Sequence, residues 1–224
     1  MAARVSETFV LRTYPFREGD LIVSFFTRDQ GKLRGVARRA RRPKSPFGSG
    51  LERLSHVRMS YYQRENADLA NLTGCELIQS QFDLGSDYAR GIAMDFFTET
   101  AEHLLPEHEP NEKFFRLIMA SLAHLRSGKR TAEGVVRDQG DGDVWTTVTY
   151  FALWSVKLAG ILPDLRLKNE SVEIAEEMLQ QPLSGLTPRE WSKGIAADLR
   201  RALVRTMEQH VERKFLTVPL LEAL

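Results

Sequence analysis

Cysteine is almost absent from the 224-residue chain, which contains only Cys75. A single cysteine cannot form an intrachain disulfide, and it cannot supply the two or more thiolates of a cysteine-based zinc site. We expect Cys75 to be a buried structural thiol, with a catalytic nucleophile as the alternative. The low cysteine content fits a reducing compartment.

Long apolar segments are also missing from the sequence. No window approaches the roughly 20 consecutive apolar residues that a membrane-spanning helix requires. The opening residues, MAARVSETFVLRTY, contain no apolar stretch of signal-peptide length. We therefore expect no membrane partner and a cytoplasmic location.

Sequence motifs of common enzyme classes are absent as well. The chain has no phosphate-binding P-loop, no GxGxxG, no GxSxG and no HExxH. The acidic stretch 138–143 lacks the register and the closing glutamate of a calcium loop, which favours a flexible loop over a cation site. The histidines near 102–109 match no common metal spacing, so we interpret them as a solvated helix end. We expect a protein that is not an enzyme and that binds no metal or other cofactor.

The charges that are present divide the chain into two parts. Residues 1–80 contain 14 Lys and Arg against 8 Asp and Glu, which gives a net charge of +6. Residues 81–224 contain 17 against 22, which gives −5. A charge difference of this kind between halves indicates nucleic-acid or membrane partners.

The basic part has the pattern of β structure. Short segments rich in β-branched and aromatic residues are separated by turns of Gly, Asp and Pro, which is typical of antiparallel strands. The predicted strands are Glu7–Tyr14, Asp20–Thr27, Lys32–Arg39, His56–Tyr62 and Leu69–Ile78. From about residue 83 the apolar side chains recur with the period of a helix. Strands followed by helices predict an α+β chain with two domains, residues 1–80 and 81–224.

Two features of the helical part are specific enough to test. The segment Val148–Ala159 is apolar around most of its circumference, so we expect it to be the central helix. Thr187, Pro188 and Glu190 form a capping-box pattern, which predicts that the last long helix begins at Pro188.

One basic cluster stands out within the first part. Between residues 30 and 51 there is no acidic residue. Period-two alternation should put Arg34 and Arg38 together on an exposed strand face. Such an array matches the spaced charges of a phosphate backbone. We therefore take the following as candidate nucleic-acid-binding residues: Lys32, Arg34, Arg38, Arg39, Arg41, Arg42 and Lys44.

Two alternatives remain for this cluster: a patch that binds an acidic protein, and an ordinary solvated face. Aromatic residues occur nearby, and bases of single-stranded nucleic acid stack on such rings. Phe47, Tyr61 and Tyr62 are therefore candidate stacking platforms.

The residues of this region resemble a known family. FVLRTYPFREGDLIV at 9–23 is similar to the opening of the RecO family of bacterial DNA repair proteins. GKLRGVARRARRPKS at 31–45 is similar to the second signature of that family. The segments Leu51–Leu54 and Leu158–Leu165 and the closing helix through His210 and Lys214 also fit.

The resemblance implies a five-stranded OB-fold barrel followed by an all-α helical domain. It implies a recombination mediator, without catalytic residues, that binds single- and double-stranded DNA and anneals complementary strands. It also implies a nucleoid-associated location and three protein partners: RecR, the C-terminal tail of single-stranded-DNA-binding protein (SSB), and RecA, whose loading such proteins assist.

The chain departs from the family at one point. Many members carry a four-cysteine zinc module, whereas Arg166–Leu186 contains no cysteine, so we expect the zinc module to be absent. The rival hypothesis is a protein-interaction adaptor whose basic barrel patch binds an acidic protein segment and not DNA.

An acidic, apolar tail such as that of SSB would dock in an apolar groove rimmed by cations. The candidate cations lie near the end of the chain, with a solvated face as the alternative: Arg200, Arg201, Arg205, Arg213 and Lys214.

Overall fold

The computed structural model describes residues 3–63, 67–127, 142–164 and 167–224. The chain forms two compact units. The barrel unit comprises residues 1–83 and 105–115, and the helical unit comprises residues 84–104 and 116–224. We refer to residues 105–115 as the strap. This segment follows residues 84–104 of the helical unit in the chain, but it packs with the barrel unit.

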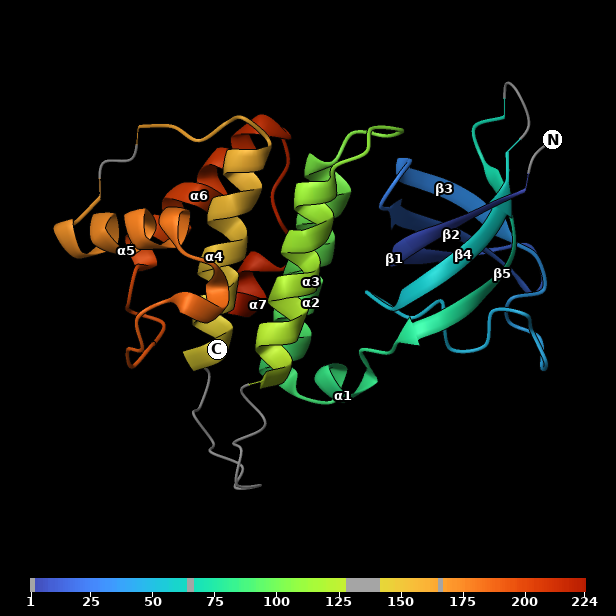
Figure 1. Ribbon diagram of the computed structural model, residues 1–224, viewed down its shortest axis with the longest axis horizontal. Coiled ribbons are helices and arrows are strands. Elements are labelled where there is room, and N and C mark those ends of the chain that lie inside the picture. Colours follow the sequence, from blue (N-terminus) through green and yellow to red (C-terminus); the bar gives the residue numbers. More distant parts are fainter. Residues whose placement is uncertain (1–2, 64–66, 128–141, 165–166) are drawn as a thin grey trace. The chain divides into compact units, whose positions relative to one another are not determined.

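Five strands close into a barrel in the order β1-β2-β3-β5-β4, with β3 and β5 parallel and the other neighbours antiparallel (Figure 1). The strands are β1 (Arg4–Phe16), β2 (Asp20–Thr27), β3 (Gly31–Ala37), β4 (His56–Tyr62) and β5 (Ala70–Gln79). Closure leaves no unpaired sheet edge. The predicted fold class, an OB-fold barrel followed by helices, is confirmed.

The barrel core consists of side chains that point inward at alternate strand positions, among them Val23, Phe25 and Leu33. The connection between β3 and β4 is a series of tight turns that begins at Arg38. It buries Phe47 against this core, and Leu54 returns to the sheet by donating its backbone N–H to the carbonyl oxygen of Val10 at 2.7 Å. The turns that contain the basic residues 38–44 are therefore attached to the barrel core by apolar side chains that follow them, such as Phe47.

The helical unit is organised around α4 (Gly142–Leu158), as its circumferential apolar pattern predicted. Twelve of its 17 residues are buried, and it contacts α2, α5 and α6. Three threonines in this helix, Thr146, Thr147 and Thr149, donate their hydroxyls to carbonyl oxygens one turn earlier, which satisfies them inside an apolar environment.

The remaining helices are short or amphipathic. They are α1 (Phe82–Gly85), α2 (Tyr88–Leu104), α3 (Glu112–Ser127), α5 (Asn169–Gln180), the 3-10 turn η1 (Leu183–Gly185), α6 (Ala197–His210) and α7 (Val218–Glu222). No helix in the described part of the chain is both long and apolar enough to cross a membrane.

The predicted start of the last long helix is wrong. α6 begins at Ala197, and residues 187–192 are not helical. The carboxylate of Glu177 in α5 accepts the backbone N–H of Thr187 and forms an ion pair with Arg189. These contacts with α5 hold the capping-box residues outside a helix, and a local sequence pattern does not reveal them.

Candidate nucleic-acid interface

Five of the predicted cations lie in the turns that follow β3, and all five are exposed. We call this set the turn cluster: Arg38, Arg39, Arg41, Arg42 and Lys44. Two of its members have left-handed backbone conformations, with φ of 54° at Arg39 and 62° at Lys44. β3 ends at Ala37, two residues before the predicted end, so Arg38 and Arg39 project from a turn and not from a strand.

The turn cluster rests on the turn between β1 and β2. Arg41 donates its backbone N–H to the carbonyl oxygen of Gly19 at 3.1 Å, and Arg39 donates its backbone N–H to Oδ1 of Asp20 at 2.8 Å. Gly19 has φ of +85°, and the side chain of Arg42 passes over it. The two turns together form one end of the barrel.

This arrangement brings in a cation that the sequence prediction missed. Arg17 lies in the β1–β2 turn, is exposed, and has its guanidinium 5.1 Å from the centroid of the Phe16 ring. It is separated from the turn cluster by some twenty residues of sequence. Only the pairing of β2 with β3 brings the ends of these strands together.

The other two candidate cations, Lys32 and Arg34, both contact the strap. Lys32 is only 5% exposed, so its expected role as a surface contact is wrong. His108 donates its backbone N–H to the carbonyl oxygen of Lys32 at 3.0 Å, and Lys32 pairs with Glu107 in a parallel β-bridge. Arg34 is exposed as predicted, but its Nε lies 3.3 Å from Oε1 of Glu107.

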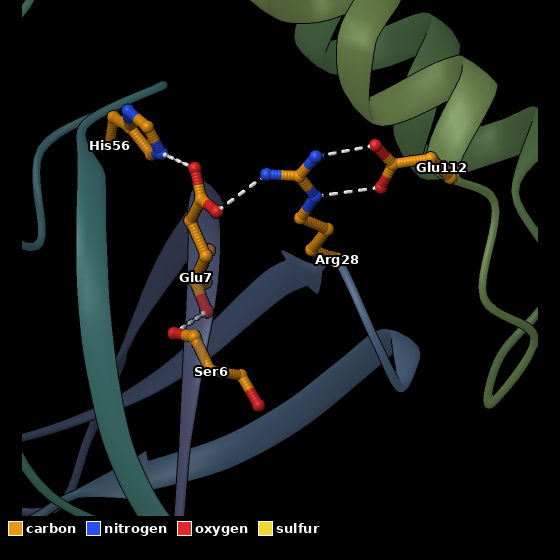
Figure 2. A network of polar contacts seen from close by, with 6 residues as sticks. Ser6, Glu7, Arg28, His56 and Glu112 are labelled. Carbon is orange, nitrogen blue, oxygen red and sulfur yellow. Dashed lines mark hydrogen bonds and ion pairs between the residues drawn. The ribbon is translucent and has the colours of Figure 1, made fainter.

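A polar network holds the far end of the strap (Figure 2). Arg28 donates two hydrogen bonds to the carboxylate of Glu112, at 2.7 Å and 2.6 Å, and a third to Glu7 at 2.9 Å. Glu7 also contacts Nε2 of His56 at 2.8 Å. Burial alone would raise the pKa of Glu7, but the hydrogen bonds from Arg28 and His56 outweigh it and lower that pKa. The hydrogen bonds to Glu112 and Glu7 raise the pKa of Arg28, so this cation is already matched by two carboxylates.

Two of the three predicted stacking platforms are wrong. Phe47 belongs to the barrel core. Tyr61 is also in the core, where its ring meets Phe25 edge-on at 5.7 Å and its hydroxyl contacts Oγ of Ser6 at 3.1 Å. Tyr62 is half-buried. The alternation of β4 turns Tyr61 inward, and the β3–β4 connection folds Phe47 onto the same core.

Cys75 is placed as a structural thiol. Its Sγ donates to the carbonyl oxygen of Phe47 at 3.4 Å and fills the space over Gly50. Burial raises the pKa of the thiol to about 11, so almost none of it is thiolate at neutral pH. The residue helps to fasten the basic turns to β5.

Within the described ranges, no group of three or more His, Cys, Asp and Glu side chains is arranged to hold a metal ion. The acidic residues 138–141, considered above as a cation loop, lie outside the described residues.

The helical unit contains a pocket of about 200 Å³ beside α6. Its apolar wall includes Phe96 of α2, Trp145 of α4 and Leu221 of α7. Four of the five cations proposed for a partner tail line it, namely Arg200, Arg201, Arg205 and Lys214, whereas Arg213 does not. Two carboxylates, Glu208 and Glu222, share the rim.

Arg200 is the fixed cation of this pocket. It is only 6% exposed, and its guanidinium lies 4.5 Å from the Trp145 ring. It donates to Oγ1 of Thr149 at 3.1 Å and to the carbonyl oxygen of Ile195 at 2.6 Å. Burial lowers its pKa to about 10, so it keeps its positive charge at neutral pH. A buried cation held by neutral oxygens can still attract an anionic group.

Comparison with known families covers both parts of the chain. The N-terminal domain of recombination protein O matches residues 1–81, and the C-terminal domain of recombination protein O matches residues 85–168. The DNA repair protein RecO of Koribacter versatilis is 37% identical, over 98% of each chain.

Two further relatives carry the same name. The DNA repair protein RecO of Syntrophus aciditrophicus is 27% identical over 73% of this chain, and that of a Nocardioides species is 35% identical over 70%. The matched part spans 58% and 59% of these two proteins, less than two thirds of their length. The barrel, the helices that follow it and the full-length similarity agree, and the chain belongs to the RecO family of DNA repair and recombination proteins.

Proposed function

We propose that this protein is a non-enzymatic recombination mediator that binds single- and double-stranded DNA through its barrel unit. The observation that carries the proposal is the turn cluster. Its five cations are exposed on neighbouring turns, and none of them forms an ion pair with a carboxylate in the described part of the chain. Membership of the RecO family supports DNA as the polyanion.

The chemistry of the turn cluster suits a phosphate backbone. Four of the five residues are arginines, whose planar guanidinium groups bind phosphate oxygens in pairs. Each phosphate neutralised releases condensed counterions, so affinity falls linearly with salt on a double logarithmic scale. Such contacts are independent of sequence, as strand annealing requires.

The test compares the wild-type chain with a variant in which all five residues of the turn cluster are alanine. Binding to labelled single strands and duplexes is measured over a range of salt concentrations. We expect weaker binding, and a slope that is shallower by about 0.7 per lost contact for single strands and about 0.9 for duplexes. Equal affinity of the two proteins would refute the proposal.

The same titration separates DNA binding from the adaptor alternative. An adaptor would bind a glutamate-rich peptide through the turn cluster and would show no steep salt dependence with DNA. We expect the opposite ranking, with the oligonucleotide bound more tightly than a peptide of equal charge.

We further propose that the protein anneals complementary strands and, with RecR, assists RecA loading on SSB-coated DNA. The family resemblance supports these activities. Annealing of labelled complementary strands coated with SSB should proceed with the wild-type chain and fail with the five-alanine variant. Co-purification with RecR tests that partner directly.

The pocket of the helical unit is our proposed site for the acidic tail of SSB. Apolar residues of the tail would lie against Val204 and Val218, which line the pocket and are partly exposed, and its carboxylates would face the cations of α6. The double variant Arg201→Glu/Arg205→Glu should weaken binding of an SSB tail peptide to the full chain. Arg213→Glu is the matched control, because Arg213 is exposed nearby but does not line the pocket. Equal weakening by both variants would contradict this assignment.

A further inference from the structure

We infer that the outer face of β1, β2 and β3 binds the bases of single-stranded DNA, with Tyr14 as the ring on which a base stacks. This inference rests on the proposed DNA-binding function and names the strand type and the surface. The turn cluster explains how phosphates are held, but it contains no aromatic ring. The buried positions of Phe47 and Tyr61 leave the question of a base platform open.

Strand register identifies the outer face. Tyr14 of β1 lies opposite Ile22 of β2, and Ile22 lies opposite Val36 of β3. Residues that are directly opposite in a sheet point to the same side. The intervening residues Val23 and Ala37 belong to the barrel core, so this row faces outward.

The row is apolar and accessible. Tyr14 is 44% exposed, and both Ile22 and Val36 are only half-buried. An aromatic ring beside two β-branched side chains forms a small apolar surface close to the turn cluster. A base that stacked on Tyr14 would cover part of this surface, and stacking of this kind does not depend on base identity.

Arginines lie on both sides of the row. One step along the strands, about 7 Å away, Arg12 of β1 lies opposite Ser24, and Ser24 lies opposite Arg34 of β3. On the other side begins the turn cluster, with Arg38 just beyond the end of β3. Two carboxylates lie at that end: Glu18, which is exposed in the β1–β2 turn, and Asp20, whose Oδ1 already accepts the backbone N–H of Arg39. The apolar row therefore lies between two groups of cations. When a base of single-stranded DNA stacks on this row, the phosphates before and after that base can each contact one of the two groups.

The strap limits this surface at its other end. Phe26 of β2 lies opposite Lys32, and its ring packs edge-on against Phe114 at 6.1 Å. The strap therefore covers the row of Phe26 and Lys32. Ser24, between Arg12 and Arg34, is also only 1% exposed. The surface open to bases is therefore the row of Tyr14, Ile22 and Val36, with Arg12 and Arg34 at one border and the turn cluster at the other, which favours a short site.

The arrangement discriminates single strands from duplexes. In a duplex the faces of the bases are stacked on one another, so Tyr14 has nothing to stack on. The turn cluster can bind phosphates of either form. Tyr14 should therefore contribute to single-strand affinity alone.

The experiment uses the full chain with Tyr14→Ala and three probes of equal length, about 12 nucleotides, which lies within the usual site size of an OB fold. The probes are oligothymidylate, an abasic oligonucleotide with the same phosphates, and a duplex. We expect Tyr14→Ala to weaken oligothymidylate binding about 5- to 150-fold. Binding of the abasic strand and of the duplex should stay within about twofold of the wild-type values, because those probes offer no stacked base to Tyr14.

Two variants serve as controls. Tyr14→Phe keeps the ring and should bind oligothymidylate like the wild type. Tyr88→Ala removes another tyrosine, 72% exposed in the helical unit, and should have no effect. Circular dichroism checks that each variant is folded. The salt slope should not change with Tyr14→Ala, because no charge is lost.

The outcomes separate this inference from the proposed function. If Tyr14→Ala binds oligothymidylate as tightly as the wild type while the five-alanine variant does not, the base platform is refuted and DNA binding by the turn cluster stands. Equal losses with oligothymidylate and the abasic strand would also refute the platform, since the tyrosine would then act on phosphates. If the wild-type chain binds none of the three probes, the proposed function itself fails.

Discussion

Oε1 of Glu107 in the strap lies 3.3 Å from Nε of Arg34 on β3, although the two residues are far apart in sequence. The pair lies at the edge of the surface that we propose for DNA. The carboxylate of Glu107 thus competes with DNA phosphates for the guanidinium of Arg34.

Substitution of Glu107 should therefore strengthen DNA binding. In Glu107→Gln, Arg34 no longer has to break an ion pair before it binds a phosphate. An exposed ion pair of this kind is worth at most about 1 kcal/mol. We expect affinity for single strands to rise by up to about fivefold, with a salt slope steeper by about 0.7 if Arg34 gains one phosphate. Fluorescence anisotropy over a salt series measures both quantities.

Glu109→Gln is the control for the general loss of negative charge. Glu109 is an exposed acid of the same strap and has no side-chain ion pair in the described part of the chain. If both variants strengthen binding equally, the contact between Glu107 and Arg34 has no specific effect.

Glu7→Gln should destabilise the barrel unit at neutral pH by roughly 1–2 kcal/mol, because hydrogen bonds from charged partners are lost. The pKa of Glu7 is lowered in the folded state. Its contribution is therefore present above the unfolded-state pKa and disappears as the pH falls through the folded-state value. The destabilisation should be largest at pH 7 and smaller at pH 3, below the ordinary carboxyl range of about 4.

Urea unfolding followed by far-ultraviolet circular dichroism measures this effect. The three tryptophans, Trp145, Trp154 and Trp191, all lie outside the barrel unit, so their fluorescence would not report on it. Glu76→Gln is the control, since Glu76 forms an exposed pair with Arg58 at 3.3 Å. An equal loss of stability at both pH values would contradict the role of Glu7.

Gly31→Ala should disturb the attachment of the strap. Gly31 has φ of +76°, and a methyl group there would overlap the backbone of Glu109. We expect a loss of stability of about 2 kcal/mol or more, from the unfavourable backbone conformation together with the steric overlap. Amide hydrogen exchange in residues 105–111 should increase.

Gly48→Ala separates the two causes. Gly48 also has a positive φ, +50°, but a methyl group there would meet nothing within 4 Å. This variant should lose only about 1 kcal/mol, the cost of the left-handed conformation. A Gly31→Ala variant no less stable than Gly48→Ala would show that the strap does not press on Gly31.

Glu99→Ala should loosen the end of the helical unit. Glu99 is 1% exposed, and its carboxylate accepts the backbone N–H groups of Leu216 and Thr217, at 2.8 Å and 2.9 Å, and the hydroxyl of Thr217 at 2.6 Å. Loss of the acceptor leaves these donors without it, at a cost of about 3 kcal/mol. Tryptophan fluorescence during urea unfolding measures the change.

The same variant should weaken binding of the SSB tail peptide, because α7 follows Thr217 and supplies Leu221 to the wall of the pocket. Binding of DNA by the barrel unit should be unaffected and provides the internal control. Loss of DNA binding together with peptide binding would indicate general unfolding.

Local sequence patterns determined much of this protein. Segments rich in β-branched and aromatic residues, bounded by turn residues, identified all five strands of the barrel, and β2 and β4 have the predicted bounds. Gly, Pro and an acid-free run of cations identified the exposed turns after β3, since such turns cannot be buried without satisfying their charges. The apolar circumference of α4 identified the centre of the helical unit.

Tertiary structure alone decided which of the candidate residues are available. Lys32 and Arg34 have the same strand parity, yet Lys32 is buried and Arg34 is paired because the strap returns to β3 from more than seventy residues away. Arg17 lies next to the turn cluster only because β1, β2 and β3 pair with one another. Tyr14 and Tyr61 both occupy strands, but barrel closure turns Tyr61 into the core and leaves Tyr14 outside. Period two assigns residues to two faces of a strand, and contacts between distant segments determine which face is covered.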